Sequence, residues 1–260
     1  MLEKNYHSID VTVDQAVCIV TLNRPEARNA LGLEMREELK DFFVSVKKAN
    51  NIKVIVLTGT GLAFSAGGDL KALQNIELVS GRSRLQSGHE MIKSILDLEK
   101  PVIAAVNGVA AGAGTSVALA CDFIVAAESS NFIQSFIKVG LVPDLGSLYF
   151  LPRLVGRHRA LEMMLLGEKV SAKEMQNLGV VNRVVKDEEV LGEALIIARK
   201  LAENPVNAMG LTKRLTNKSI LSDIDETFEL EGFAQAMCFD SEDFKEGVSA
   251  FIEKRKPQFS

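Results

Sequence analysis

A single carboxylate, Asp144, lies in the stretch KVGLVPDLGS (138–147), which otherwise consists mostly of glycine, proline and aliphatic residues. Two interpretations fit such an acid. Pro-Asp-x-Gly is a good turn sequence, in which the aspartate side chain accepts hydrogen bonds from nearby backbone N–H groups. Alternatively, apolar surroundings raise the pKa of a carboxyl group, which helps one group act as base and acid in turn.

Two glycine-rich turns could supply the partner for proton transfer. They are LTGTGLAFSAGGDL (57–70) and AVNGVAAGAGTSVALACD (105–122), and each follows an apolar run of strand type. Small residues let a ligand approach the backbone, and a helix N-terminus presents unpaired N–H groups. Two such turns could aim two N–H donors at one oxygen, as in an oxyanion hole. The first turn begins like a dinucleotide-binding fingerprint, but Phe64 occupies the third glycine position.

These turns and the Asp144 loop require a scaffold, for which the hydrophobic pattern predicts a mostly parallel α/β core. SIDVTV and AVCIVTL (8–22) form a predicted hairpin, and a helical apolar face follows with Met35, Leu39, Phe42, Phe43 and Val46. IKVIVLTG (52–59) has the continuous apolar character of a strand buried on both faces. Strands that alternate with helices indicate βα crossovers.

The pattern becomes helical after about residue 148. Ser171 and Glu174 form a predicted capping box, and VVNRVV (180–185) is a last short strand. From about residue 188 onward, amphipathic helices carry many aromatic side chains. These helices could either form an oligomer contact or pack on the chain's own core.

Composition excludes several classes of protein. The 260 residues carry a net charge of −4, which gives no electrostatic footprint for nucleic acid or an anionic membrane. The apolar segment 102–127 is rich in alanine and interrupted by polar residues and glycine, so it is a predicted soluble core rather than a membrane span. The N-terminus has no apolar stretch of the signal-peptide kind.

Cysteine and histidine placement predicts neither disulfides nor a metal site. Cys18, Cys121 and Cys238 are widely spaced in apolar surroundings, which is typical of buried free thiols in a reducing compartment. The three histidines are far apart and show no ligand spacing, so we expect no metal.

Four segments resemble those of the crotonase family, the enoyl-CoA hydratase/isomerase superfamily. They are LNRPEARNAL (22–31), FSAGGDL (64–70), NGVAAGAG (107–114) and the ending AFIEKRKPQF (250–259), so the resemblance runs essentially end to end. It implies an α/β spiral of ββα units over residues 1–195, which binds acyl-CoA, and a helical trimerisation region over 196–260. The implied protein is a cytoplasmic trimer or dimer of trimers. It has no separate cofactor, since coenzyme A is part of the substrate, and no nucleic-acid or membrane partner.

The resemblance also assigns residues by position. It places the oxyanion-hole N–H groups at Ala66 and Ala113. It implies substrate or CoA contacts at Arg24, Gly67, Gly68, Asp69, Phe251 and Lys254, with Lys254 reaching a neighbouring subunit's ligand.

The acidic residues that the chain has, and those that it lacks, limit which reaction the sequence predicts. The family's well-known hydratases use two glutamates, but Ser116 and Phe136 stand at the corresponding positions of this chain and are expected to line the pocket. Asp144 matches a catalytic aspartate of the family's dienoyl-CoA isomerases and epoxyphenylacetyl-CoA isomerases, and residues 135–161 most resemble the latter group. The predicted activity is an acyl-CoA isomerase that converts 3-enoyl to 2-enoyl thioesters or opens an epoxide ring, with Asp144 as the only proton shuttle.

Two other functions remain open at this point. An enoyl-CoA hydratase with unusual catalytic groups would add water to the product, whereas an isomerase would not. A catalytically silent subunit would bind acyl-CoA and turn none of it over. A serine protease on the related spiral fold is disfavoured because no serine–histidine pairing is evident.

Overall fold

The computed structural model describes residues 4–74 and 76–259, which form two sheets surrounded by helices. The larger sheet has the strand order β1-β2-β3-β5-β7-β10, and the smaller has β4-β6-β8-β9. The larger sheet comprises β1 (Ile9–Asp14), β2 (Val17–Leu22), β3 (Val54–Gly59), β5 (Val102–Val106), β7 (Phe123–Ala127) and β10 (Arg183–Val185). The smaller comprises β4 (Ala63–Ser65), β6 (Val109–Ala111), β8 (Asn131–Ile133) and β9 (Lys169–Ser171).

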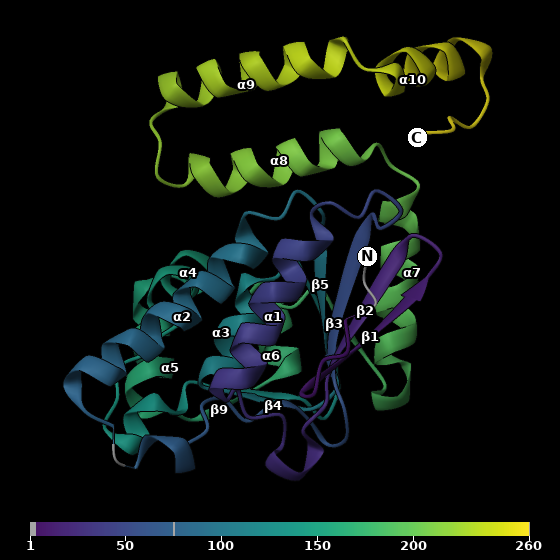
Figure 1. Ribbon diagram of the computed structural model, residues 1–260. Coiled ribbons are helices and arrows are strands. Elements are labelled where there is room, and N and C mark those ends of the chain that lie inside the picture. The colour runs from purple at the N-terminus through teal and green to yellow at the C-terminus, as the bar shows by residue number, and fades with distance from the viewer. Residues whose placement is uncertain (1–3, 75, 260) are drawn as a thin grey trace.

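Helices connect and cover these sheets (Figure 1). The α-helices are α1 (Leu33–Val46), α2 (Leu78–Leu96), α3 (Ala113–Ala120), α4 (Ser147–Val155), α5 (Arg157–Leu166), α6 (Ala172–Asn177), α7 (Val190–Ala202), α8 (Val206–Ser219), α9 (Ile224–Phe239) and α10 (Glu242–Glu253). Short 3-10 turns lie at Pro25–Ala27, Lys71–Leu73, Ser135–Val139 and Asp187–Glu189.

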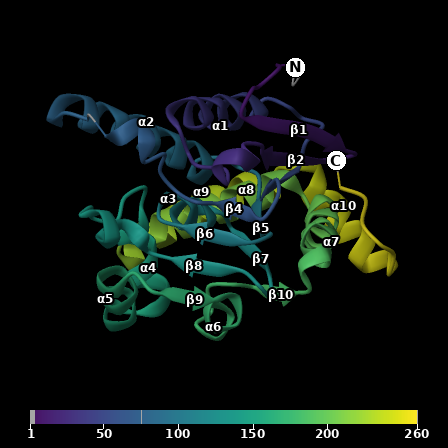
Figure 2. The ribbon, with the colours of Figure 1, turned by 90° about the horizontal axis from the view of Figure 1, so that it is seen from below.

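Successive strand pairs build the predicted spiral. β3, β5 and β7 are parallel neighbours in the larger sheet, and the strands that directly follow them, β4, β6 and β8, are parallel neighbours in the smaller one. A helix follows each of these pairs along the chain. Figure 2 shows β4, β6, β8 and β9 laid out beside one another in this order. In each ββα unit of the spiral, the end of the second strand therefore leads to the start of a helix.

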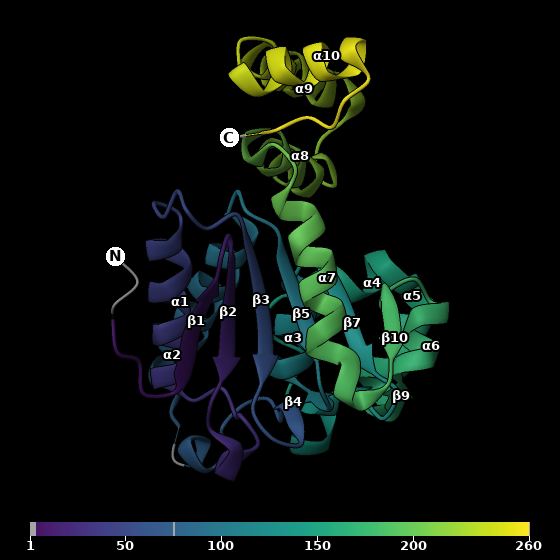
Figure 3. The same cartoon turned by 90° about the vertical axis from the view of Figure 1, so that its right-hand side faces the viewer.

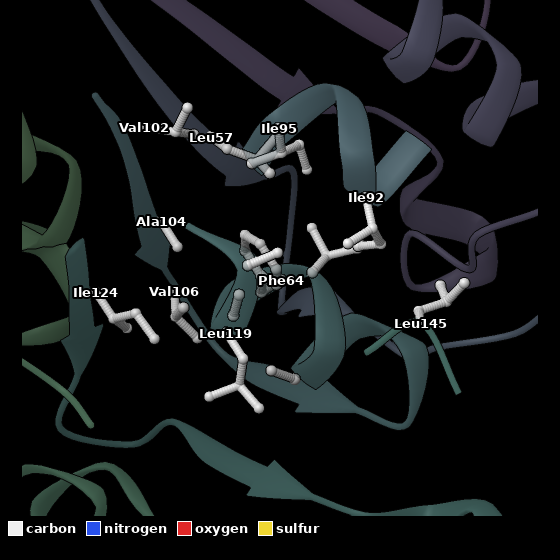
Figure 4. Packing of buried hydrophobic residues seen from close by; sticks show 14 of the residues in the cluster. Leu57, Phe64, Ile92, Ile95, Val102, Ala104, Val106, Leu119, Ile124 and Leu145 are labelled. Carbon is white, nitrogen blue, oxygen red and sulfur yellow. The ribbon is translucent and has the colours of Figure 1, made fainter. Parts of the chain in front are cut away.

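Strand β3 of the larger sheet is buried on both faces, as its continuous apolar pattern predicted. Val54 and Val56 of β3 pack with α7 on one face, whereas Ile55 and Leu57 join the main core on the other (Figure 3). Phe64 of β4 lies in the middle of that main core (Figure 4). Because successive side chains of β3 point to opposite faces of the sheet, helices pack against both faces of this strand. This packing holds in place the end of the strand, from which the next loop starts.

The C-terminal helices α8, α9 and α10 stand beyond one end of the larger sheet (Figures 1 and 3). Helix α9 buries none of its residues, and Phe233 on it is 70% exposed. The hypothesis that these helices pack on the chain's own core therefore fails for α9, while self-association stays a prediction. The expected boundary between residues 195 and 196 falls inside α7, whose Ala194 and Ile197 pack on the larger sheet. The projecting region begins with α8.

Several local predictions are confirmed. The 8–22 hairpin forms as β1 and β2. The predicted capping box forms only in part, because the Ser171 side chain accepts the Glu174 N–H at 3.1 Å but the Glu174 carboxylate pairs with Arg159. The predicted strand over 180–185 is reduced to Arg183–Val185, because the Asn182 side chain accepts the Ile124 N–H instead. All cysteines in the described residues are free thiols. No helix among the described residues is long and apolar enough to cross a membrane.

Candidate active site

The two glycine-rich turns meet at the start of α3. Ala113 is the first residue of α3, so its N–H points out of the helix without an intrahelical acceptor. Gly67, with φ +95°, lies against it: a Cβ on Gly67 would stand 3.3 Å from the Ala113 nitrogen and 2.5 Å from the Ala111 oxygen. Only glycine fits that conformation and that spacing. The predicted meeting of two turns around one small space is confirmed.

The first N–H donor differs from the predicted one. The Ala66 N–H donates to the Arg28 carbonyl at 2.9 Å, so it is not free to meet a thioester oxygen. The next unpaired amide is that of Gly68, which has no hydrogen-bond acceptor among the described residues and open space where a Cβ would lie. The geometry therefore offers Gly68 and Ala113 as the pair, with Gly67 between them.

The Asp144 side chain is half-buried and has no hydrogen-bond partner. Its Oδ1 atom is buried and unpaired within the described part of the chain, and no backbone N–H there caps the carboxylate. The turn-cap interpretation therefore fails. Burial raises the pKa of Asp144 above the ordinary aspartate value, and electrostatic interaction, chiefly with Arg36, acts against that rise. A carboxylate without partners is available for proton transfer.

The backbone around Asp144 is held in an unusual conformation. Leu145 has φ +48°, which is rare for a residue with a branched side chain, and Gly146 has φ +88°. The Leu145 side chain is fully buried in the main core (Figure 4). A core anchor directly after the acid therefore fixes the direction in which the carboxylate leaves the loop.

A chain of buried polar groups supports the same loop from behind. Gln134 Nε2 donates to Ser147 Oγ at 3.2 Å, which lies 2.8 Å from Ser116 Oγ, and Ser116 Oγ donates to the Asp144 carbonyl at 2.9 Å. Ser116 is fully buried. It was expected to line the pocket, but it instead ties the first turn of α3 to the Asp144 loop.

The Phe136 ring lies close to the turn that leads into α3, 3.7 Å from the place where a Cβ on Gly112 would stand. Its role as a wall of the acyl pocket remains a prediction. Because neither Ser116 nor Phe136 carries a carboxyl group, Asp144 is the acid that remains for this site.

Arg24 and Asp69 lie together near Gly68. Their charged groups are 3.7 Å apart, and Asp69 Oδ1 accepts the Ala72 N–H at 3.4 Å at the following 3-10 turn. Their contact with CoA remains a prediction. Phe251 is 85% exposed on α10, and Lys254 caps that helix, so neither reaches the Asp144 site of the same chain. Their contacts with CoA, that of Lys254 from a neighbouring subunit, remain predictions.

Sequence reasoning missed the arginines that face Asp144. Arg36 is 3% exposed although it lies on α1 next to the apolar stripe. Arg84 lies on α2, and its Nη2 atom is buried without a hydrogen-bond partner. Nothing in the helical pattern distinguishes them from surface arginines. In the described part of the chain, no three His, Cys, Asp or Glu side chains gather as a metal-binding group.

Comparisons with known proteins find relatives over nearly the whole chain. Residues 12–260 match the family model described as enoyl-CoA hydratase/isomerase. The chain is 39% identical to the 1,2-epoxyphenylacetyl-CoA isomerase of Escherichia coli K12, over 95% of this chain and 96% of the relative. It is 36% identical to the crotonyl-CoA hydratase of Syntrophomonas wolfei, over 98% of each.

Solved structures of enoyl-CoA hydratases also superpose closely on this chain. A crystal structure of an enoyl-CoA hydratase subunit from Geobacillus kaustophilus superposes with a TM-score of 0.94 at 36% identity, over 99% of each chain. A structure of an enoyl-CoA hydratase from Polaromonas superposes with the same TM-score of 0.94 at 37% identity. The relatives thus include proteins named for isomerisation and proteins named for hydration.

Proposed function

Since the chain belongs to the enoyl-CoA hydratase/isomerase family, we propose that it is an isomerase of acyl-CoA thioesters that uses Asp144 as its only proton shuttle. The substrate is a 3-enoyl-CoA, converted to the conjugated 2-enoyl-CoA, or an epoxide whose ring opens through the same kind of enolate. The observation that carries the proposal is the buried Oδ1 of Asp144, which is unpaired and has no second carboxylate acting on it among the described residues.

The proposed reaction moves one proton. The Asp144 carboxylate removes a proton from C2 of the 3-enoyl thioester, and the electron pair of that C–H bond passes to the thioester oxygen. The Gly68 and Ala113 N–H groups stabilise the resulting enolate oxygen. The protonated Asp144 then returns its proton to C4, and the double bond between C2 and C3 forms. No water enters the product, and the carboxylate is regenerated.

Hydration fits this site less well. It needs one group to activate water and another to deliver a proton to C2. Ser116 is buried in a hydrogen-bonded chain and Phe136 has no proton to exchange, so neither replaces a glutamate. Because several relatives are named hydratases, the activity assay must also test for hydration.

The test supplies a 3-enoyl-CoA and, separately, a 2-enoyl-CoA to the wild-type protein. The proposal expects the absorbance of the conjugated thioester to rise with the first substrate and a product of unchanged mass. With the second substrate, absorbance should not fall through hydration. Loss of absorbance with a gain of one water in mass would assign a hydratase. Tight acyl-CoA binding with no turnover of either substrate would assign a silent subunit.

The pH dependence of the reaction follows from the raised pKa of Asp144. The base must be ionised, and a raised pKa means that it becomes protonated at a higher pH than an ordinary aspartate. We therefore expect kcat/KM to be highest above that pKa and to decline on acidification before ordinary aspartates titrate. The measurement is kcat/KM against pH with an uncharged acyl chain. An acid limb at or below the ordinary aspartate pKa would contradict the expectation.

Replacing Gly68 with proline removes the proposed N–H donor. We expect kcat to fall by about a hundred- to a thousandfold, because one oxyanion-hole donor has an effect of roughly that size. The matched control is Gly68→Ala, which keeps the N–H and has open space for its Cβ. The measurement is kcat for both variants, with acyl-CoA binding as a check on folding. Equal activity of the two variants would exclude Gly68 as a donor.

A further inference from the structure

The first turn of α3 touches both parts of the proposed site. Its first residue, Ala113, presents the amide proposed to bind the enolate oxygen. Three residues later, Ser116 Oγ donates to the main-chain carbonyl of Asp144 at 2.9 Å. The Ser116 amide donates to the Gly112 carbonyl at 3.1 Å, which closes the helical turn between the two residues. A single hydrogen-bonded turn therefore connects the oxyanion-hole donor to the backbone of the acid.

The start of α3 is itself fixed to the smaller sheet. Thr115 Oγ1 donates to the Ala110 carbonyl of β6 at 2.7 Å. The Gly112 amide donates to the Ile133 carbonyl of β8 at 2.8 Å. Because these bonds tie the helix start to two strands, the Ser116 hydroxyl is a firm point of attachment for the loop that it contacts.

The Asp144 loop depends on such an attachment. Residues 141–144 belong to no helix or strand, and Leu145 after them has a positive φ. A strained conformation of this kind persists only where the surroundings hold it. The Asp144 carbonyl accepts the Ser147 N–H at 3.1 Å as well as the Ser116 hydroxyl. The first bond is local to the loop, whereas the bond from Ser116 comes from α3.

The neighbours of Ser116 leave its proton free for the Asp144 carbonyl. Ser116 Oγ lies 2.8 Å from Ser147 Oγ, and Gln134 Nε2 donates to Ser147 Oγ at 3.2 Å. Each hydroxyl has one proton, so both are satisfied when Ser147 donates to Ser116 and Ser116 donates to the carbonyl. All three side chains are at most 1% exposed, so bulk water does not compete for these bonds.

We propose that Ser116 is a positioning residue, whose hydroxyl holds the Asp144 carboxylate at a set distance from the Gly68 and Ala113 amides. This inference rests on the proposed function, because it takes Asp144 as the base and the two amides as the oxyanion hole. It concerns the rate of proton transfer and not the recognition of any part of the acyl chain.

The backbone is where this acid has to be held. Oδ1 of Asp144 has no hydrogen-bond partner among the described residues, so no bond to that atom directs it. The carbonyl and the side chain of Asp144 share one Cα atom, so a bond to the carbonyl restricts where the carboxylate lies. In the substrate, the oxygen and C2 are attached to the same thioester carbon. The acid and the amides must therefore keep their spacing, and a misplacement of about 1 Å can slow a reaction about a hundredfold.

The first test compares Ser116→Ala with wild type on 3-hexenoyl-CoA. We expect kcat to fall about ten- to a hundredfold, while KM and acyl-CoA affinity change by about twofold or less. Ser116→Cys has nearly the same shape and a weaker donor, so it should recover part of the rate. The control is Ser94→Ala. Ser94 is also buried and donates to the Met91 carbonyl within α2, so its removal deletes a similar bond and should leave kcat unchanged.

A second background separates positioning from a general effect on the fold. If Ser116 acts through Asp144, Ser116→Ala should not slow the residual reaction of Asp144→Asn any further, because both side chains serve one proton transfer. Hydrogen exchange should be faster at the amides of residues 145–147 in Ser116→Ala and unchanged in Ser94→Ala. Melting temperature and acyl-CoA binding report folding, and Ser116→Cys replaces Ser116→Ala in the same comparison if the alanine variant unfolds.

Three results would overturn the inference. They are a kcat of Ser116→Ala equal to that of wild type, an equal loss in Ser94→Ala, and the same loss on the Asp144→Asn background as on wild type. A lower melting temperature with unchanged kcat belongs to the first of these, and would assign Ser116 to stability alone. Failure of the proposed isomerase activity would appear separately, as no conversion of 3-hexenoyl-CoA by wild type.

Discussion

Replacing Asp144 with asparagine is expected to slow conversion of a 3-enoyl-CoA by about a hundred- to ten-thousandfold, the usual contribution of a positioned general base. Asparagine has nearly the same shape but cannot take up the C2 proton. The Oδ1 position has no hydrogen-bond partner to lose among the residues that the structure describes, so acyl-CoA binding should change little. The measurement is kcat and KM from the rise in conjugated thioester absorbance.

Stability provides the control for this variant. The pKa of Asp144 is raised in the folded protein, so ionisation above that pKa opposes folding, and stability from this group is lost as pH rises. At neutral pH the uncharged asparagine should therefore melt at the same temperature as wild type or higher. Asp97→Asn, at an exposed position after α2, removes an equal charge and should leave the rate unchanged. Full activity of Asp144→Asn would exclude the proposed role.

Replacing Lys213 with methionine is expected to lower the free energy of unfolding by about 3–5 kcal/mol. Lys213 of α8 is nearly buried, lies 2.8 Å from Asp122 and donates to the carbonyls of Ile95 and Lys100. These contacts attach α8 to the core. Methionine would leave the Asp122 carboxylate without its cation in a largely desolvated place. The measurement is the urea-unfolding midpoint.

Two further variants make this prediction specific. Lys218→Met on the same helix breaks only the exposed pair with Glu226, and should cost about 1 kcal/mol or less. The double variant Lys213→Met with Asp122→Asn should recover part of the loss, because no unpaired charge remains. Equal effects of Lys213→Met and Lys218→Met would show that the buried pair does not hold α8.

The fold could be predicted where the hydrophobic pattern was long. The apolar residues from Met35 to Val46 repeat with the period of a helix that is buried on one face. The continuous apolar run of β3 is typical of a strand that is buried on both faces. Both features are found in the structure. The strands β4, β6 and β8 have three residues each, which is too short for any period to show. Yet these short strands aim the two glycine-rich turns at each other.

The site could be predicted in its types of residue but not in all its atoms. Asp144 and Ala113 stand out as an acid in an apolar loop and a helix start after glycine. Choosing between Ala66 and Gly68 requires knowing which amide the backbone already uses, and that depends on the contact with Arg28, far away in sequence. In the sequence Arg84 looks like any helix-surface arginine, because the burial of its Nη2 atom appears only in the folded chain.

The central claim, that Asp144 carries one proton from C2 to C4, is tested most directly with a 3-enoyl-CoA deuterated at C2. Because Oδ1 of Asp144 is buried, we expect part of the deuterium to appear at C4 of a 2-enoyl product of otherwise unchanged composition. The Asp144→Asn variant should show no such transfer. A 3-hydroxyacyl product, or deuterium transfer to C4 that survives Asp144→Asn, would contradict the claim.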